Sequence, residues 1–203
     1  MMMLEKESNY GKRKAAGQRV ISRRSGAEKS AQDTLQRRSA ELAALHATLQ
    51  DISAPYRLPE LLEKILERAV HLLNAHRGSL FLADHNKKKV QCAAVYGFSA
   101  HAAQMTLEFG QGAAGKVAES GQPLIIQDYP AWPGKIQDPA DLRQIKALIS
   151  VPMLWQGQVS GVINVAETSS ARAFTHADIE LLSMFANQSA ILVENARLLQ
   201  AEH

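Results

Sequence analysis

The sequence predicts an α+β fold, in which a six-stranded antiparallel sheet carries helices on its faces. Short apolar segments between residues 77 and 167, most of them joined by short polar turns, predict the sheet. Long helical patterns before and after these segments supply the layers that cover it. The chain has 203 residues, of which 46% are hydrophobic, so one well-filled core is available.

Basic residues are concentrated at the N-terminus. Residues 1–40 carry ten Lys and Arg residues against four Asp and Glu residues, whereas residues 41–203 carry thirteen against sixteen. We interpret residues 1–27 as a basic, disordered leader, because few aromatic residues interleave with the charges and no helix-turn-helix pattern follows. A nucleic-acid or membrane-surface arm is the alternative. Nucleic acid is therefore not the expected partner.

Residues 28–54 are predicted to form a helix that pairs with a copy of itself. The stretch from 28 to 52 lacks Gly and Pro, and Leu35, Leu42 and Leu49 recur at a spacing of seven. This apolar seam is too narrow to cover a globular core. We expect a signalling or dimerisation helix and hence a homodimer.

The rest of the chain, residues 55–203, is predicted to be one folded domain. A helix from about Pro59 to Asn74 has a broad apolar face. Two strands follow within "RGSLFLADHNKKKVQCAAVYG", a third at "MTLEF", a fourth at "PLIIQD" and two more within "ALISVPMLWQGQVSGVINVAE". Pro152 is expected at a bulge or at a position without a ladder donor. Residues 128–146 contain three prolines and are expected to lie across the sheet as a cover.

A long C-terminal helix ends the domain. Thr175 is its expected N-cap, with Asp178 in an acidic variant of the capping box. The helix has two apolar stripes. We expect one to be buried against its own domain, and the other, which has coiled-coil spacing, to pack on a partner. The first consists of Leu181, Met184 and Ile191, and the second of Leu182, Phe185, Leu192 and Leu199.

The segment "GQGAAGK", residues 110–116, matches two phosphate-binding patterns. For a dinucleotide site the following helix is too short, because Gly121 and Pro123 end it after about one and a half turns. For a phosphate loop the residue after Lys116 must be Ser or Thr, and Val117 stands there. The glycines are instead expected to turn the chain into a short helix whose N-terminal amides face a cleft.

This segment, extended to "GQGAAGKVAESGQPLIIQD", resembles the GAF domains, which are small-molecule-sensing modules of signalling proteins. The resemblance continues in "ALISVPMLWQGQVSGVINVAE" and closes with "FTHADIELLSMFANQSAILVENARL". It covers residues 58–199 and implies a GAF-like sheet, flanked by the two terminal helices of coiled-coil type.

The resemblance also implies a ligand held between the sheet and residues 128–146. The expected lining residues are Phe81, Cys92, Ile126, Asp128, Tyr129, Trp132, Ile136, Leu142, Ile145 and Met153. Independently of the family, an Asp, a Tyr and a Trp beside apolar groups suit a small planar or polar molecule. The alternative for each of these residues is that it fills core beneath a long loop.

Two differences from the sequence patterns of known GAF domains restrict the functions that we expect of this chain. GAF domains that bind cyclic nucleotides resemble this chain at Asn164, Phe174 and Asp178, but Val165 replaces the Lys of their pattern. The Lys–Asp ion pair of that pattern is thus excluded, and Asn164 and Asp178 are expected to be structural. Relatives that reduce methionine sulfoxide use several cysteines, whereas Cys92 is the only one here.

The resulting hypothesis is a small-molecule-sensing regulatory module in signal transduction. It is expected to be a cytoplasmic, non-enzymatic homodimer without a membrane span or metal site. It would pass its ligand state to a signalling partner protein, and its ligand and any cofactor are unknown. A ligand-free dimerisation scaffold is the first alternative, and an enzyme that uses Cys92 is the second.

Overall fold

The computed structural model describes residues 57–136, 140–169 and 173–201. The predicted leader 1–27 and the predicted helix 28–54 lie outside these residues. Six strands form one sheet in the order β3-β2-β1-β6-β5-β4, and each neighbouring pair is antiparallel. The strands are β1 (Arg77–Asp84), β2 (Lys89–Tyr96), β3 (Thr106–Glu108), β4 (Leu124–Ile126), β5 (Ala147–Trp155) and β6 (Gln158–Glu167). The predicted antiparallel sheet is confirmed.

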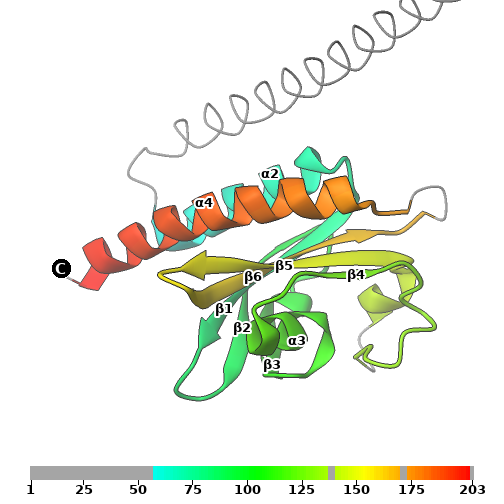
Figure 1. Cartoon of the computed structure of the whole chain (residues 1–203), viewed down its shortest axis with the longest axis horizontal. Coiled ribbons are helices and arrows are strands. Elements are labelled where there is room, and N and C mark those ends of the chain that lie inside the picture. The colour runs from blue at the N-terminus through cyan, green and yellow to red at the C-terminus, as the bar shows by residue number, and fades with distance from the viewer. Residues whose placement is uncertain (1–56, 137–139, 170–172, 202–203) are drawn as a thin grey trace, which may run out of the picture. The chain divides into compact units, whose positions relative to one another are not determined.

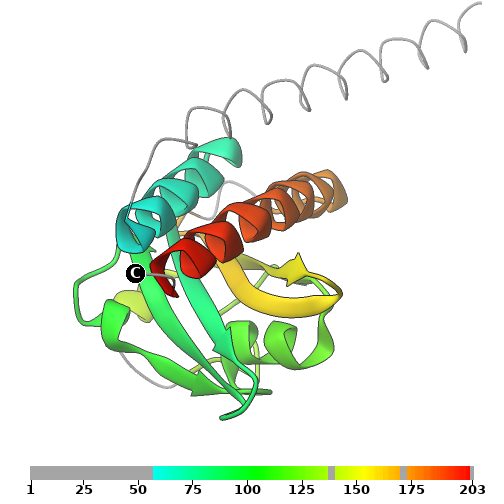
Figure 2. The ribbon, with the colours of Figure 1, turned by 90° about the vertical axis from the view of Figure 1, so that its left-hand side faces the viewer.

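Two helices, α2 (Leu58–Leu72) and α4 (His176–Ala201), lie side by side on one face of the sheet (Figures 1 and 2). The short helix α3 (Gly112–Ser120) and the described parts of the covering segment, residues 128–136 and 140–146, lie on the other face (Figure 1). Two 3-10 turns, η1 (Ala102–Gln104) and η2 (Ala140–Gln144), complete the described elements. The apolar face of α2 is buried as its pattern predicts.

The two faces of the sheet divide the core. Gly78 and Leu80 of β1 face the helix layer, and a Cβ on Gly78 would lie 2.6 Å from a methyl group of Val70. Because side chains alternate along a strand, Ser79 and Phe81 point to the opposite face. This alternation decides which residues reach the covering segment.

Helix α4 begins as its sequence predicts. The Thr175 amide donates to the Asp178 carboxylate at 2.7 Å, and the Asp178 amide donates back to Thr175 Oγ1 at 3.3 Å. These reciprocal bonds satisfy amides that the first helical turn leaves without partners.

The buried stripe of α4 differs from the prediction. Leu182 and Phe185 are buried, whereas Met184 and Ile191 are 38% and 45% exposed. The prediction that Met184 and Ile191 are buried was wrong, because α4 turns its other stripe toward β5. At Pro152 the structure places the bulge one step later, between Met153 and Leu154.

Candidate functional site

A pocket of about 40 Å³ lies between the sheet and the covering segment. The walls come from β1, β3, β5, β6, the connection through η1, the start of α3 and the covering segment. The lining residues are Ser79, Phe81, Phe98, Ala102, Met105, Leu107, Ala113, Ala114, Tyr129, Ile136, Leu142, Ile145, Leu148, Asn164 and Ala166. None of these described residues is Asp, Glu, Lys, Arg or His, so this part of the lining is uncharged apart from any ionisation of Tyr129.

Three polar residues form a row across the sheet, and two of them, Ser79 and Asn164, lie on the floor of the pocket. Ser79 of β1, Asn164 of β6 and Ser150 of β5 are register partners on three adjacent strands. The Asn164 side chain donates from Nδ2 to Ser79 Oγ at 3.4 Å, and Asn164 is only 7% exposed. Among the described residues, Asn164 Oδ1 and Ser150 Oγ have no hydrogen-bond partner. An unpaired buried acceptor is costly, so Asn164 Oδ1 is a position where a donor from outside the chain would be stabilised.

The covering segment is closed at its base by backbone hydrogen bonds. The Tyr129 amide donates to the Lys146 carbonyl, and the Lys146 amide donates to the Glu167 carbonyl, both at 2.8 Å. At the near end the Ala131 amide donates to Asp128 Oδ1 at 3.2 Å. These bonds fix where the segment leaves and rejoins the sheet.

Aromatic rings fill the space beneath the segment. The rings of Tyr129 and Trp132 lie 5.9 Å apart at an interplanar angle of 39°. Burial raises the pKa of the Tyr129 hydroxyl, and a backbone hydrogen bond with Ile136 offsets only part of this rise. Tyr129 is therefore neutral near pH 7 and offers the pocket a hydroxyl group.

Arg77 lies beside the pocket, against the lining residue Phe98, and is not itself one of the described lining residues. Its guanidinium carbon stands 5.3 Å from the centre of the Phe98 ring, and its Nη2 donates to Gln144 Oε1. Arg77 thus joins the first strand to η2 of the covering segment. The contact holds the wall of the pocket that contains Phe98 against the wall that contains Leu142.

The backbone of the "GQGAAGK" segment requires residues without a side chain at Gly112 and Gly115. Gly112 has a φ of +62°, and a Cβ there would lie 2.8 Å from Cδ1 of Ile136. A Cβ on Gly115 would lie 2.2 Å from the Glu108 carbonyl oxygen. These glycines let α3 start against the covering segment and against β3. The expectation that they turn the chain into a short helix is confirmed.

Five of the ten predicted lining residues come together in the pocket. They are Phe81, Tyr129, Ile136, Leu142 and Ile145. Ile126 and Trp132 belong to the adjoining apolar cluster and do not reach the pocket, and Asp128 is exposed and bonded to its own loop. Met153 is fully buried and packs beside Gly161 on the helix-covered face, away from the pocket.

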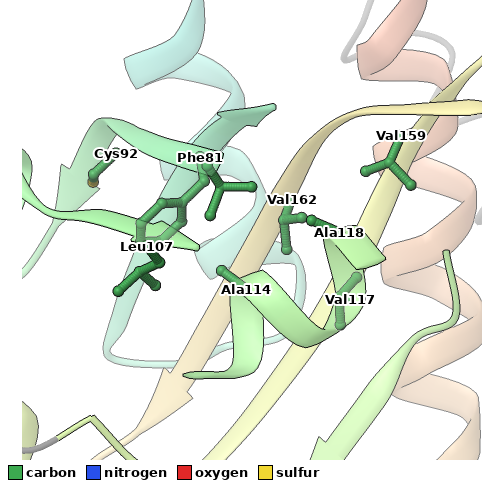
Figure 3. Close-up of a cluster of buried hydrophobic side chains, with 9 residues drawn as sticks. Phe81, Cys92, Leu107, Ala114, Val117, Ala118, Val159 and Val162 are labelled. Carbon is green, nitrogen blue, oxygen red and sulfur yellow. The ribbon is translucent and has the colours of Figure 1, made fainter. Parts of the chain in front are cut away.

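Cys92 belongs to a second buried cluster beside the pocket, together with Phe81, Leu107 and residues of α3 (Figure 3). Burial raises the pKa of its thiol to about 11, and a backbone hydrogen bond with Ala94 offsets only part of this rise. A thiol in this state is protonated at neutral pH and is a poor nucleophile.

The pocket also contains residues that the sequence interpretation missed, chiefly Ser79 and Asn164 on its floor and Phe98, Met105 and Leu107 on its walls. The prediction that Asn164 is only structural does not account for its free oxygen. Strand alternation counted back from Phe81 was the available signal for Ser79. No comparable signal exists for Phe98 or Met105, which lie in an irregular connection.

Across the part of the chain that the structure describes, no group of three or more His, Cys, Asp and Glu residues is placed to hold a metal ion. Among the same residues, no helix is long and apolar enough to cross a membrane.

A family model described as "GAF domain" matches residues 57–194. The chain is 25% identical over 154 residues to the Nif-specific regulatory protein of Azospirillum lipoferum, which covers 72% of this chain. It is 29% identical over 168 residues to the dual 3',5'-cyclic-AMP and -GMP phosphodiesterase 11 of Drosophila melanogaster, which covers 74% of this chain.

The chain spans 24% of the length of that regulatory protein and 12% of the length of the phosphodiesterase. Among solved structures, it is similar to the GAF domain from a phosphoenolpyruvate-protein phosphotransferase of Coxiella burnetii. The TM-score is 0.69 at 23% identity, and the match covers 79% of this chain and 96% of the other. At this identity the likeness bears on the fold alone.

Proposed function

The chain belongs to the GAF domain family, and from that premise we propose that it is a regulatory module that senses a small molecule. The observation that carries the proposal is the pocket beneath the covering segment, with Asn164 Oδ1 buried and without a partner. Its similarity to the Nif-specific regulatory protein supports a regulatory setting.

Ligand state would reach α4 through two connections. The covering segment is bonded to the end of β6, since the Lys146 amide donates to the Glu167 carbonyl. On the other side, Gln127 donates from Nε2 to the carbonyl of Phe174, two residues before α4 begins. A ligand that lifts or tightens the segment therefore acts on both the strand and the loop that lead into α4.

The output would be the packing of α4 against a second copy of the chain. Met184, Ile191 and Leu198 recur at a spacing of seven and are 38%, 45% and 59% exposed. Exposed apolar residues at this spacing suit a helical pair. The proposed homodimer would present its ligand-dependent arrangement to a signalling partner protein, a coupling that requires unequal ligand affinity for the two arrangements.

The pocket volume favours a second candidate function, a ligand-free dimerisation scaffold. About 40 Å³ is small beside the roughly 300–1,000 Å³ of typical ligand sites. In that case the pocket is a packing gap, and only the exposed stripe of α4 has a function. For either candidate we propose that the chain is not an enzyme, a proposal that the buried, protonated Cys92 supports.

Native mass spectrometry of the freshly purified full chain tests these proposals. A dimer that carries an additional small mass is the result expected of the sensor. A bare dimer whose melting temperature no member of a small-molecule library raises would favour the scaffold. A bare monomer at micromolar concentration would contradict the homodimer in both.

A further inference from the structure

The pocket lining restricts the charge of its ligand. The lining residues that the structure describes include no side chain that is charged at neutral pH, and Arg77, beside the pocket, is already bonded to Gln144 and stacked over Phe98. A buried anion without a compensating charge is strongly disfavoured. This applies to a carboxylate and to the phosphate of a cyclic nucleotide.

The polar groups also have a definite arrangement. On the floor, Asn164 Oδ1 lacks a donor and lies in the same row as Ser79. On the wall, Ala113 and Ala114 belong to the first turn of α3, whose N-cap residue Gln111 makes no side-chain cap bond. Amides of a first helical turn carry partial positive charge and favour an acceptor. The pocket thus suits a ligand that places a hydrogen-bond donor at Asn164 Oδ1 and a hydrogen-bond acceptor at the start of α3.

The body of a ligand has room on the outer side of the same wall, in a hollow lined by both polar and apolar residues. An open hollow of about 370 Å³ shares Met105, Leu107 and Ile136 with the pocket. Met105 is an unbranched, half-buried side chain, and such side chains change conformation readily. A shift of Met105 or Ile136 would join the two spaces into a site for a ring.

We infer that the pocket selects an uncharged ligand whose hydrogen-bond donor meets Asn164 Oδ1, such as a carboxamide or lactam on an aromatic or apolar body. This inference rests on the proposed sensor function and specifies its ligand class. Anionic molecules, cyclic nucleotides included, are not ligands of this pocket.

Three probes of nearly equal shape test the class: benzamide, acetophenone and benzoate. Acetophenone replaces the donor NH₂ by a methyl group, and benzoate adds a charge. Titrations of the full chain are followed by amide chemical shifts of the pocket residues. We expect benzamide to bind at least about tenfold more tightly than either of the others, which is the effect of one buried hydrogen bond.

Two variants test whether Asn164 causes the preference for benzamide over acetophenone. Asn164→Leu conserves volume and removes the acceptor, so benzamide should lose its preference over acetophenone. Asn195→Leu makes the same change at an exposed position of α4 and should keep the preference. A preference that survives in Asn164→Leu overturns the assignment to Asn164. The wild-type titrations test the class even if that variant does not fold.

The possible results distinguish failure of the proposed ligand class from failure of the proposed sensor function. Tighter binding of benzoate, or of cyclic GMP, overturns the uncharged class and leaves the sensor function standing. Absence of any pocket shift with all three probes at millimolar concentration overturns the class as well. Native mass spectrometry then decides the function separately, since a retained small molecule supports the sensor and its absence argues against it.

Discussion

At the scale of single residues, burial decides the chemistry of Cys92. The side chain is 5% exposed, lies in an apolar cluster and has a pKa raised to about 11. We expect a thiol reagent such as a disulfide dye to react with native Cys92 many times more slowly than with the unfolded chain at pH 8. Rapid reaction in the native state would contradict both the burial of the thiol and its raised pKa.

Glu167 is a buried carboxylate held by hydrogen bonds. Burial alone would raise its pKa, but donors from Ser169, His76 and Thr168 outweigh burial and lower it. A lowered pKa means that the carboxylate stabilises the fold above its unfolded value, near 4.5, and that this contribution is lost as the pH falls through the folded value.

Glu167→Gln is therefore expected to destabilise the protein at pH 7 and to have a smaller effect at about pH 3.5. Urea unfolding of both proteins at the two pH values measures this change. Glu167→Ala, which removes the acceptor altogether, should cost about 1–3 kcal/mol at pH 7. A Gln variant whose deficit does not depend on pH would show that the carboxylate charge is not what these donors stabilise.

At the scale of elements, the start of α3 depends on the absence of a side chain at Gly115. A Cβ there would lie 2.2 Å from the Glu108 carbonyl oxygen, which is backbone and cannot turn aside. Gly115→Ala must therefore move α3 away from β3. Because Ala113 and Ala114 line the pocket, the pocket moves with the helix.

Gly157 supplies the matched comparison. It has a φ of +80°, and a Cβ there would have no atom within 4 Å. We expect Gly157→Ala to cost only the backbone strain of about 1–2 kcal/mol. Gly115→Ala should lower the melting temperature further and shift pocket amide resonances, whereas Gly157→Ala should leave those resonances in place. Equal effects would mean that β3 and α3 are not in close contact.

At the scale of the whole molecule, the exposed stripe of α4 is the surface proposed for a second copy. Ile191→Glu would place a charge in the middle of that stripe, where Ile191 is 45% exposed. We expect the dimer to weaken by about tenfold or more, measured by light scattering over a range of concentrations. Gln200→Glu adds the same charge at another exposed position of α4 and should leave the dimer unchanged. If both variants behave like the wild type, the stripe is not the interface.

Local sequence patterns were sufficient to predict the antiparallel strands, the turns between them, the capped start of α4 and the role of the glycines before α3. Each of these depends on local chemistry, namely alternation of polarity, conformational freedom at positive φ, and side chains that bond the nearest amides. The family resemblance added the expectation that a ligand site lies beneath the segment at residues 128–146. That placement predicted five of the pocket residues, including Phe81 and Tyr129.

The side that each residue faces depends on tertiary contacts. A strand pattern separates Met153 from Leu154 but does not say which of the two faces receives the helices, so Met153 was expected on the pocket side. The two stripes of α4 are similarly apolar, and contact with β5 selected Leu182 and Phe185 for burial. Asn164 is a polar residue in an apolar strand, and only its neighbours on β1 and β5 show that its oxygen is left without a partner. These features depend on contacts between segments far apart in the chain, and local patterns do not contain them.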